Sequence, residues 1–218
     1  MIYKKMKGAL LTGAVCATAI TGAFAYFSGT AATKENVFTI VAGEKGDDTA
    51  GTIEEPNWPT EDTDTDGIPD AAEDLTPGSE VNKDPQLTSN VDYESWVFLK
   101  VEVPTLNAQM EADSGVDKVY DSVTYQINGA DWVDVTASVD GAGKSDTAGE
   151  KSVYVYAYNK KLAAGGKTSA LFDKITVPEF TKTEAVNDSV DVSGALIQTE
   201  GYVSYTDALT ALTGDGVL

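Results

Sequence analysis

The sequence predicts an all-β fold: an antiparallel, jelly-roll-like β-sandwich that carries a long acidic loop and follows an N-terminal signal helix. Short β-prone runs recur about every 10 to 20 residues with little helix between them, a spacing typical of antiparallel sandwiches. The clearest run, 96–103, places alternate apolar residues on one face and ends at Pro104. A length of 218 residues allows one core of fair size.

The other elements are predicted from similar runs. A compact β-prone run, Asn36–Val41, forms the first strand. Further strands, two of them separated by an Asn128-Gly129 turn, are expected at 118–127, 132–139, 152–158, 170–177 and 190–203. Residues 206–212 are predicted to form a short C-terminal helix with Thr206 as its cap.

The run 152–158 alternates small apolar residues with tyrosine. Tyr154, Tyr156 and Tyr158 therefore share one face of the predicted strand. Such a stripe can stack on carbohydrate, but alternate aromatic residues on a sandwich face more often pack inside the protein. We interpret the three tyrosines as packing or interface residues.

Residues 1–25 have the features of a secretory signal peptide. Three lysines lie among the first seven residues, a mostly apolar stretch follows, and Ala23-Phe24-Ala25 offers small residues for cleavage. We expect cleavage after Ala25, which leaves a single domain, 26–218, outside the cell. The alternative is an uncleaved membrane anchor, since the uncharged stretch continues to Thr33.

Composition excludes several functions. The formal net charge of -20 argues against a nucleic-acid partner, because phosphate contacts need clustered cations, and leaves membrane contact only through the uncleaved signal. Histidine is absent and Cys16, inside the signal, is the only cysteine. Zinc hydrolysis and Ser-His-Asp or Cys-His catalysis therefore lack their residues, and the chain is not expected to be an enzyme. Disulfide bonds within one chain are excluded for the same reason.

The segment 43–84 is predicted to be a long acidic surface loop, and part of it matches a calcium-binding loop. The twelve residues from Asp62 to Glu73 place glycine at position 6 and oxygen ligands at the positions that surround one hard cation. Prolines before the loop argue against a preceding helix, so this is not a complete EF-hand. The alternative is a solvated acidic loop. The predicted Ca²⁺ ligands are Asp62, Asp64, Asp66, the carbonyl of Ile68, Asp70 and Glu73.

Several segments together resemble the TasA/camelysin (CalY) family of Gram-positive exported proteins. The similarity spans nearly the whole chain, and its pieces are Gly22-Ala23-Phe24-Ala25-Tyr26-Phe27-Ser28, Thr33-Lys34-Glu35-Asn36-Val37-Phe38-Thr39, Glu55-Pro56-Asn57-Trp58, Leu75-Thr76-Pro77-Gly78, Lys83-Asp84-Pro85, 96–104, Tyr154-Val155-Tyr156, Leu171-Phe172-Asp173 and 195–202. The resemblance implies a signal cleaved by a SipW-type signal peptidase and a jelly-roll domain that forms biofilm-matrix fibres, in which the N-terminal segment of one subunit completes the sheet of its neighbour.

The leading hypothesis is therefore a secreted structural subunit of extracellular fibres or of a biofilm matrix, located in the matrix or at the cell surface. It would polymerise with itself by exchange of the segment 26–41 and would bind calcium in its long loop. Two alternatives are a camelysin-like metalloendopeptidase, which the absence of histidine argues against, and a monomeric calcium-dependent surface adhesin.

Overall fold

The computed structural model describes residues 28–36, 50–184 and 188–214. The strands are β1 (Ser28–Asn36), β2 (Gly51–Glu54), β3 (Glu80–Asn82), β4 (Gln86–Ser89), β5 (Ser95–Gln109), β6 (Lys118–Asp121), β7 (Thr124–Tyr125), β8 (Trp132–Asp134), β9 (Lys151–Tyr158), β10 (Lys174–Thr176), β11 (Lys182–Thr183) and β12 (Val190–Gln198). The helices are three short 3₁₀ turns and one α-helix: η1 (Asp70–Ala72), η2 (Glu111–Asp113), η3 (Thr136–Ser138) and α1 (Tyr205–Gly214).

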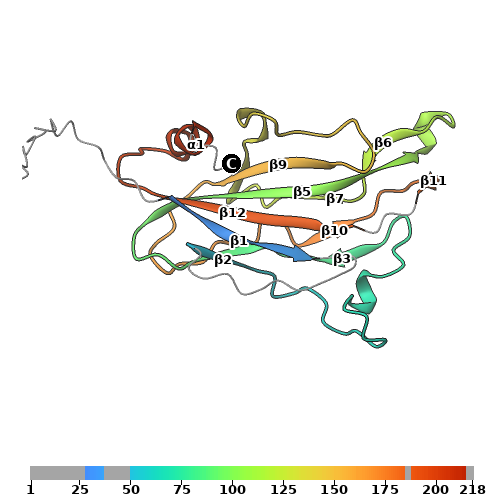
Figure 1. Cartoon of the computed structure of the whole chain (residues 1–218), viewed down its shortest axis with the longest axis horizontal. Coiled ribbons are helices and arrows are strands. Elements are labelled where there is room, and N and C mark those ends of the chain that lie inside the picture. Colours follow the sequence, from blue (N-terminus) through green and yellow to red (C-terminus); the bar gives the residue numbers. More distant parts are fainter. Residues whose placement is uncertain (1–27, 37–49, 185–187, 215–218) are drawn as a thin grey trace, which may run out of the picture.

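The strands form two sheets (Figure 1). The larger has the order β4-β2-β1-β12-β5-β9-β8, and β6 and β11 flank the far half of the long strand β5. The smaller has the order β3-β10-β7. Neighbouring strands are antiparallel except β1 and β2, which are parallel. The predicted all-β class is confirmed, whereas the predicted signal helix, 1–25, lies outside the described residues.

The main core lies between the two sheets. Val97, Leu99 and Val101 of β5 pack there with Ile175 of the smaller sheet. The opposite face of β5 carries Phe98 and Trp96, which pack with α1 in a second cluster. Because both faces of β5 are covered, its sequence is a nearly continuous apolar run, and the core strand predicted at 96–103 is confirmed.

Strand β9 confirms the predicted alternation. Val155 and Ala157 face the helix side, whereas Tyr156 and Tyr158 belong to the core between the sheets. The hydroxyl oxygens of Tyr156 and Tyr125 lie 3.0 Å apart. The buried tyrosines of this strand are therefore packing residues rather than an exposed stacking stripe.

Helix α1 forms where a short C-terminal helix was predicted, but its cap differs. The hydroxyl of Ser204 accepts a hydrogen bond from the backbone N–H of Asp207 (3.2 Å), and the Asp207 carboxylate accepts one from the N–H of Ser204 (3.2 Å). This reciprocal pair satisfies two N–H groups at the helix start, so Ser204, and not Thr206, is the cap. Among the described residues, no helix is long and apolar enough to cross a membrane.

Two local differences concern the N-terminal half and the turn between β7 and β8. The first described strand is β1, which ends where the predicted strand Asn36–Val41 begins, and residues 37–41 lie outside the described part. The Asn128-Gly129 segment links two strands of different sheets rather than two paired neighbours, since β7 pairs with β10 and β8 with β9. Pairing with distant segments here outweighs the local turn preference.

Candidate metal centre

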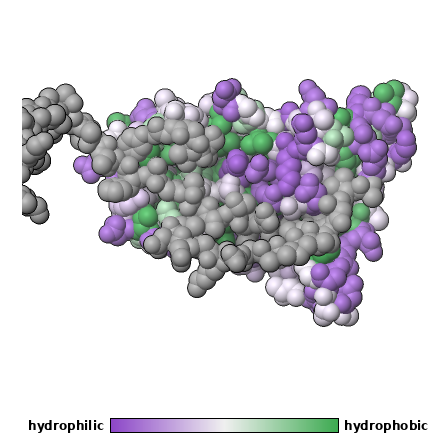
Figure 2. All heavy atoms as spheres, viewed as in Figure 1, coloured by the Kyte–Doolittle hydropathy of each residue, from purple (hydrophilic) through white to green (hydrophobic). Residues whose placement is uncertain are grey.

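The candidate metal loop leaves the body of the protein between β2 and β3. The acidic segment predicted as 43–84 contains both strands, and among its described residues the part without strands runs from 55 to 79 and includes η1. It projects from one end of the molecule, with a hydrophilic surface (Figures 1 and 2). The buried side chains of Ile68 and Ala72 anchor it to the main core. These apolar contacts hold a strongly charged loop against the body.

Asp62, Asp64 and Asp66 come together as predicted. One carboxylate oxygen from each of the three lies within 4.8 Å of the others. Two oxygens on opposite sides of one Ca²⁺ are about 5 Å apart, twice the usual bond length, so the spacing suits a single ion. The backbone is folded around these groups, because Asp62 accepts hydrogen bonds from the N–H of Thr65 (2.8 Å) and of Gly67 (3.0 Å). Gly67 has φ +96°, a left-handed conformation that favours glycine.

Asp70 is hydrogen-bonded within the loop in this structure. Its carboxylate accepts hydrogen bonds from the backbone N–H of Thr63 (2.8 Å) and from the Thr63 hydroxyl (2.5 Å). These bonds hold the pKa of Asp70 below its ordinary value. Asp70 therefore ties the two ends of the loop together and is not part of the group formed by the three other aspartates.

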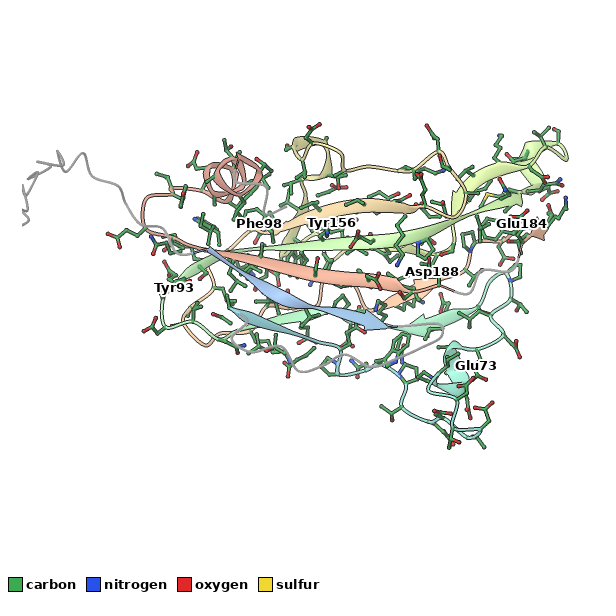
Figure 3. All side chains as sticks on the ribbon, viewed as in Figure 1. Glu73, Tyr93, Phe98, Tyr156, Glu184 and Asp188 are labelled. Carbon is green, nitrogen blue, oxygen red and sulfur yellow. The ribbon has the colours of Figure 1, made fainter. Side chains whose placement is uncertain are left out.

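Glu73 lies at the inner end of the loop, next to the body (Figure 3). Its Oε1 atom is buried and has no hydrogen-bond partner among the described residues. Partial burial raises the pKa of Glu73, and the nearby charges of Asp64, Asp66 and Asp70 raise it further. A cation held among these carboxylates would give the buried Oε1 atom of Glu73 a partner. It would also replace the repulsion between the carboxylates by attraction to a shared positive charge.

Two polar pairs close the neck of the loop. Lys83 and Glu55 form an ion pair of 2.9 Å in which both side chains are 0% exposed. Asp84 accepts two hydrogen bonds from Asn57, one from its backbone N–H and one from its side-chain amide, both 2.8 Å long. The segments Glu55-Pro56-Asn57-Trp58 and Lys83-Asp84-Pro85 thus meet in space. We call Glu55, Asn57, Lys83 and Asp84 the neck residues.

A groove of about 670 Å³ separates the metal loop from the end of the sheets. Its floor includes Leu106 and Phe180, and its rim is acidic. Glu73 lies on the loop side, whereas Glu184 and Asp188 lie on the body side (Figure 3). The high density of carboxylates makes this end of the molecule suited to cations.

The predicted ligands therefore divide into four groups. Asp62, Asp64 and Asp66 form one cluster, Glu73 lies close enough to feel two of their charges, and Asp70 serves the loop itself. Ile68 donates its N–H to Asp66 (2.8 Å) and buries its side chain. Sequence reasoning missed the neck residues, although both segments were noted. The signal in the sequence was Lys83, a lysine that follows a short β-prone run and precedes Asp84-Pro85.

Fold and loop together define an all-β protein with antiparallel sheets and one candidate cation-binding loop. Comparisons with protein-family models, curated proteins and solved structures find no match to this chain.

Proposed function

We propose that this protein is a secreted structural subunit of extracellular fibres or of a biofilm matrix, with a jelly-roll-like sandwich as its folded unit. Subunits assemble when strand β1 of one copy enters the larger sheet of the next. The resemblance to the TasA/camelysin family supports this function. The single observation that carries it is the position of β1.

Strand β1 lies inside the larger sheet, between β12 and β2. It pairs with β12 over most of its length and with β2 through one residue pair, Ala31 with Gly51. Residues 37–50 separate β1 from β2 along the chain. Consecutive parallel strands need a long connection, and a connection of this length also allows β1 to lie in another copy.

Removal of β1 leaves a slot that a second subunit can fill. The backbone groups of β12 and β2 that face β1 would become open sheet edges. A strand from another copy satisfies those groups and restores the sheet. Because the donor strand and the slot are different surfaces of one molecule, each added subunit presents a new slot, and the product is an open filament.

Electron microscopy of the purified chain 26–218 tests the fibre function directly. We expect filaments whose number increases with protein concentration, since each exchange contact forms between two molecules. A preparation that stays monomeric at every concentration would contradict the proposal and favour the monomeric adhesin. Size-exclusion chromatography of the same samples provides the count of free monomer.

Calcium binding by the loop is the second part of the proposal. The cluster of Asp62, Asp64 and Asp66, with the buried oxygen of Glu73 beside it, supports one Ca²⁺ as the ligand. The ion would neutralise part of the charge of these mutually repelling carboxylates, in a protein that is very acidic overall. The role of the metal is to stiffen the projecting loop, not to catalyse a reaction.

Loss of calcium should soften the loop without unfolding the protein. Single extracellular calcium loops bind with a dissociation constant of roughly 0.1 to 1 mM. At about 1 mM calcium and the tight end of that range, binding adds only about 1.4 kcal/mol to the free energy of unfolding. Calorimetry should therefore show a small rise in melting temperature with calcium. The double variant Asp66→Ala, Glu73→Ala should lose this rise, whereas Asp146→Ala, an exposed acid elsewhere, should keep it. A double variant with the full rise would refute the site.

A further inference from the structure

The ion pair at the neck of the loop is enclosed to an unusual degree. Lys83 is among the largest side chains that are fully buried, and the side chain of Glu55 is 0% exposed as well. The ammonium nitrogen also lies 5.2 Å from the centre of the Trp58 ring. An amine and a carboxyl group are thus held in contact in a place from which water is excluded.

This enclosure changes the chemistry of the pair. Burial disfavours charged forms, so transfer of one proton from Lys83 to Glu55 yields a neutral amine beside a neutral carboxylic acid. These are the two reactants of amide formation. The nitrogen lies 2.9 Å from Oε1, and the carboxyl carbon is one bond further. A nitrogen and a carboxyl group held in one contact also have the very high effective concentration of a fixed pair.

We infer that Lys83 and Glu55 become joined by an intramolecular amide bond. The neutral Nζ of Lys83 attacks Cδ of the protonated Glu55 carboxyl group, and a carbon–nitrogen bond forms. The bond from Cδ to the hydroxyl oxygen breaks, and this hydroxyl leaves as water with one hydrogen from Nζ. The reaction needs no oxidant, metal or cofactor. Exclusion of water from the neck favours the amide over its hydrolysis.

The bond would join the two sheets covalently. Glu55 directly follows β2 of the larger sheet, and Lys83 directly follows β3 of the smaller one. The two residues are 28 positions apart, so the amide closes the whole metal loop into a ring. Outside its predicted signal, the chain has no cysteine for a disulfide. An amide gives such a protein a cross-link that reducing agents do not open.

Mass spectrometry of the folded, purified chain tests the inference. The intact mass should be lower than the mass of its sequence by one water molecule. Trypsin should fail to cut after Lys83, because the amine that trypsin recognises is blocked, and should release residues 46–100 as one peptide that has lost one water. Digestion of that peptide before its aspartates should leave the piece with Glu55 linked to the piece with Lys83, and fragmentation should locate the link at these two residues.

Controls separate this bond from the other common loss of water. Asp-Gly pairs, such as Asp66-Gly67, can form succinimides of the same mass. A succinimide reopens in mild alkali and persists in Lys83→Met, whereas the amide survives alkali and is absent from that variant. Lys174→Met, which removes an exposed lysine, should retain the loss. A wild-type chain of unmodified mass, or efficient cleavage after Lys83, overturns the inference even if Lys83→Met does not fold.

Discussion

The variant Lys83→Met is expected to lower the free energy of unfolding by about 3 to 5 kcal/mol. Methionine fills a similar volume, so the change mainly removes the ammonium that lies 2.9 Å from the buried Glu55 carboxyl group. The loss of a buried charge from such a pair costs far more than the loss of a surface pair, because the other group stays desolvated. Where the amide bond inferred above has formed, the variant loses this cross-link in place of the ion pair, and Glu55 is again left buried without its partner.

Urea unfolding followed by tryptophan fluorescence measures this difference. The matched control is Lys174→Met, which removes a pair of similar length, 2.7 Å to Glu80, with both side chains about half exposed. Exposed pairs contribute about 0 to 1 kcal/mol, so the control should unfold almost like the parent. If the two variants lose equal stability, burial of the neck pair is not what makes it important.

Much of the fold could be predicted because the pattern of apolar residues along each strand reflects which of its faces are buried. Strand β5 alternates apolar residues on a face that is buried, and β9 alternates valine with tyrosine because its two faces meet different cores. Strand β1 was missed for the opposite reason. Its sequence, SGTAATKEN, has no apolar alternation. Its pairing with β12 is one of backbone groups, and backbone pairing leaves little trace in a sequence.

The candidate site, like the fold, was predicted only in part. The spacing of Asp62, Asp64 and Asp66 is local, so a tight turn brings them together as the pattern indicates. Asp70 was assigned as a ligand from its position, which does not reveal the hydrogen bond that its carboxylate accepts from Thr63, seven residues earlier. The neck could not be derived, because Glu55 and Lys83 meet only through the packing of two sheets. The lysine before Asp-Pro marks one segment of the neck, but no spacing along the chain shows that it meets Glu55.

A disulfide that ties β1 to its own subunit should abolish filament formation. Thr30 of β1 and Ala195 of β12 are directly opposite in the antiparallel register. Directly opposite residues have Cα atoms about 4.5 to 5.5 Å apart, within the range that a disulfide spans. The double variant Thr30→Cys, Ala195→Cys of the chain 26–218 has no other cysteine. Once oxidised in the monomer, it cannot release β1 to a neighbour.

Exchange predicts an all-or-none response to the redox state. The oxidised variant should remain monomeric, and a reducing agent should restore filaments in the same sample, because the slot and the strand become free together. The control is Lys100→Cys, Ser193→Cys, an opposite pair on β5 and β12 that leaves β1 untouched. Its filaments should form in both states, which shows that a disulfide in the sheet is harmless in itself. Oxidised Thr30→Cys, Ala195→Cys that polymerises like the parent would show that β1 stays in its own subunit. Any fibre would then be built from contacts between complete sandwiches.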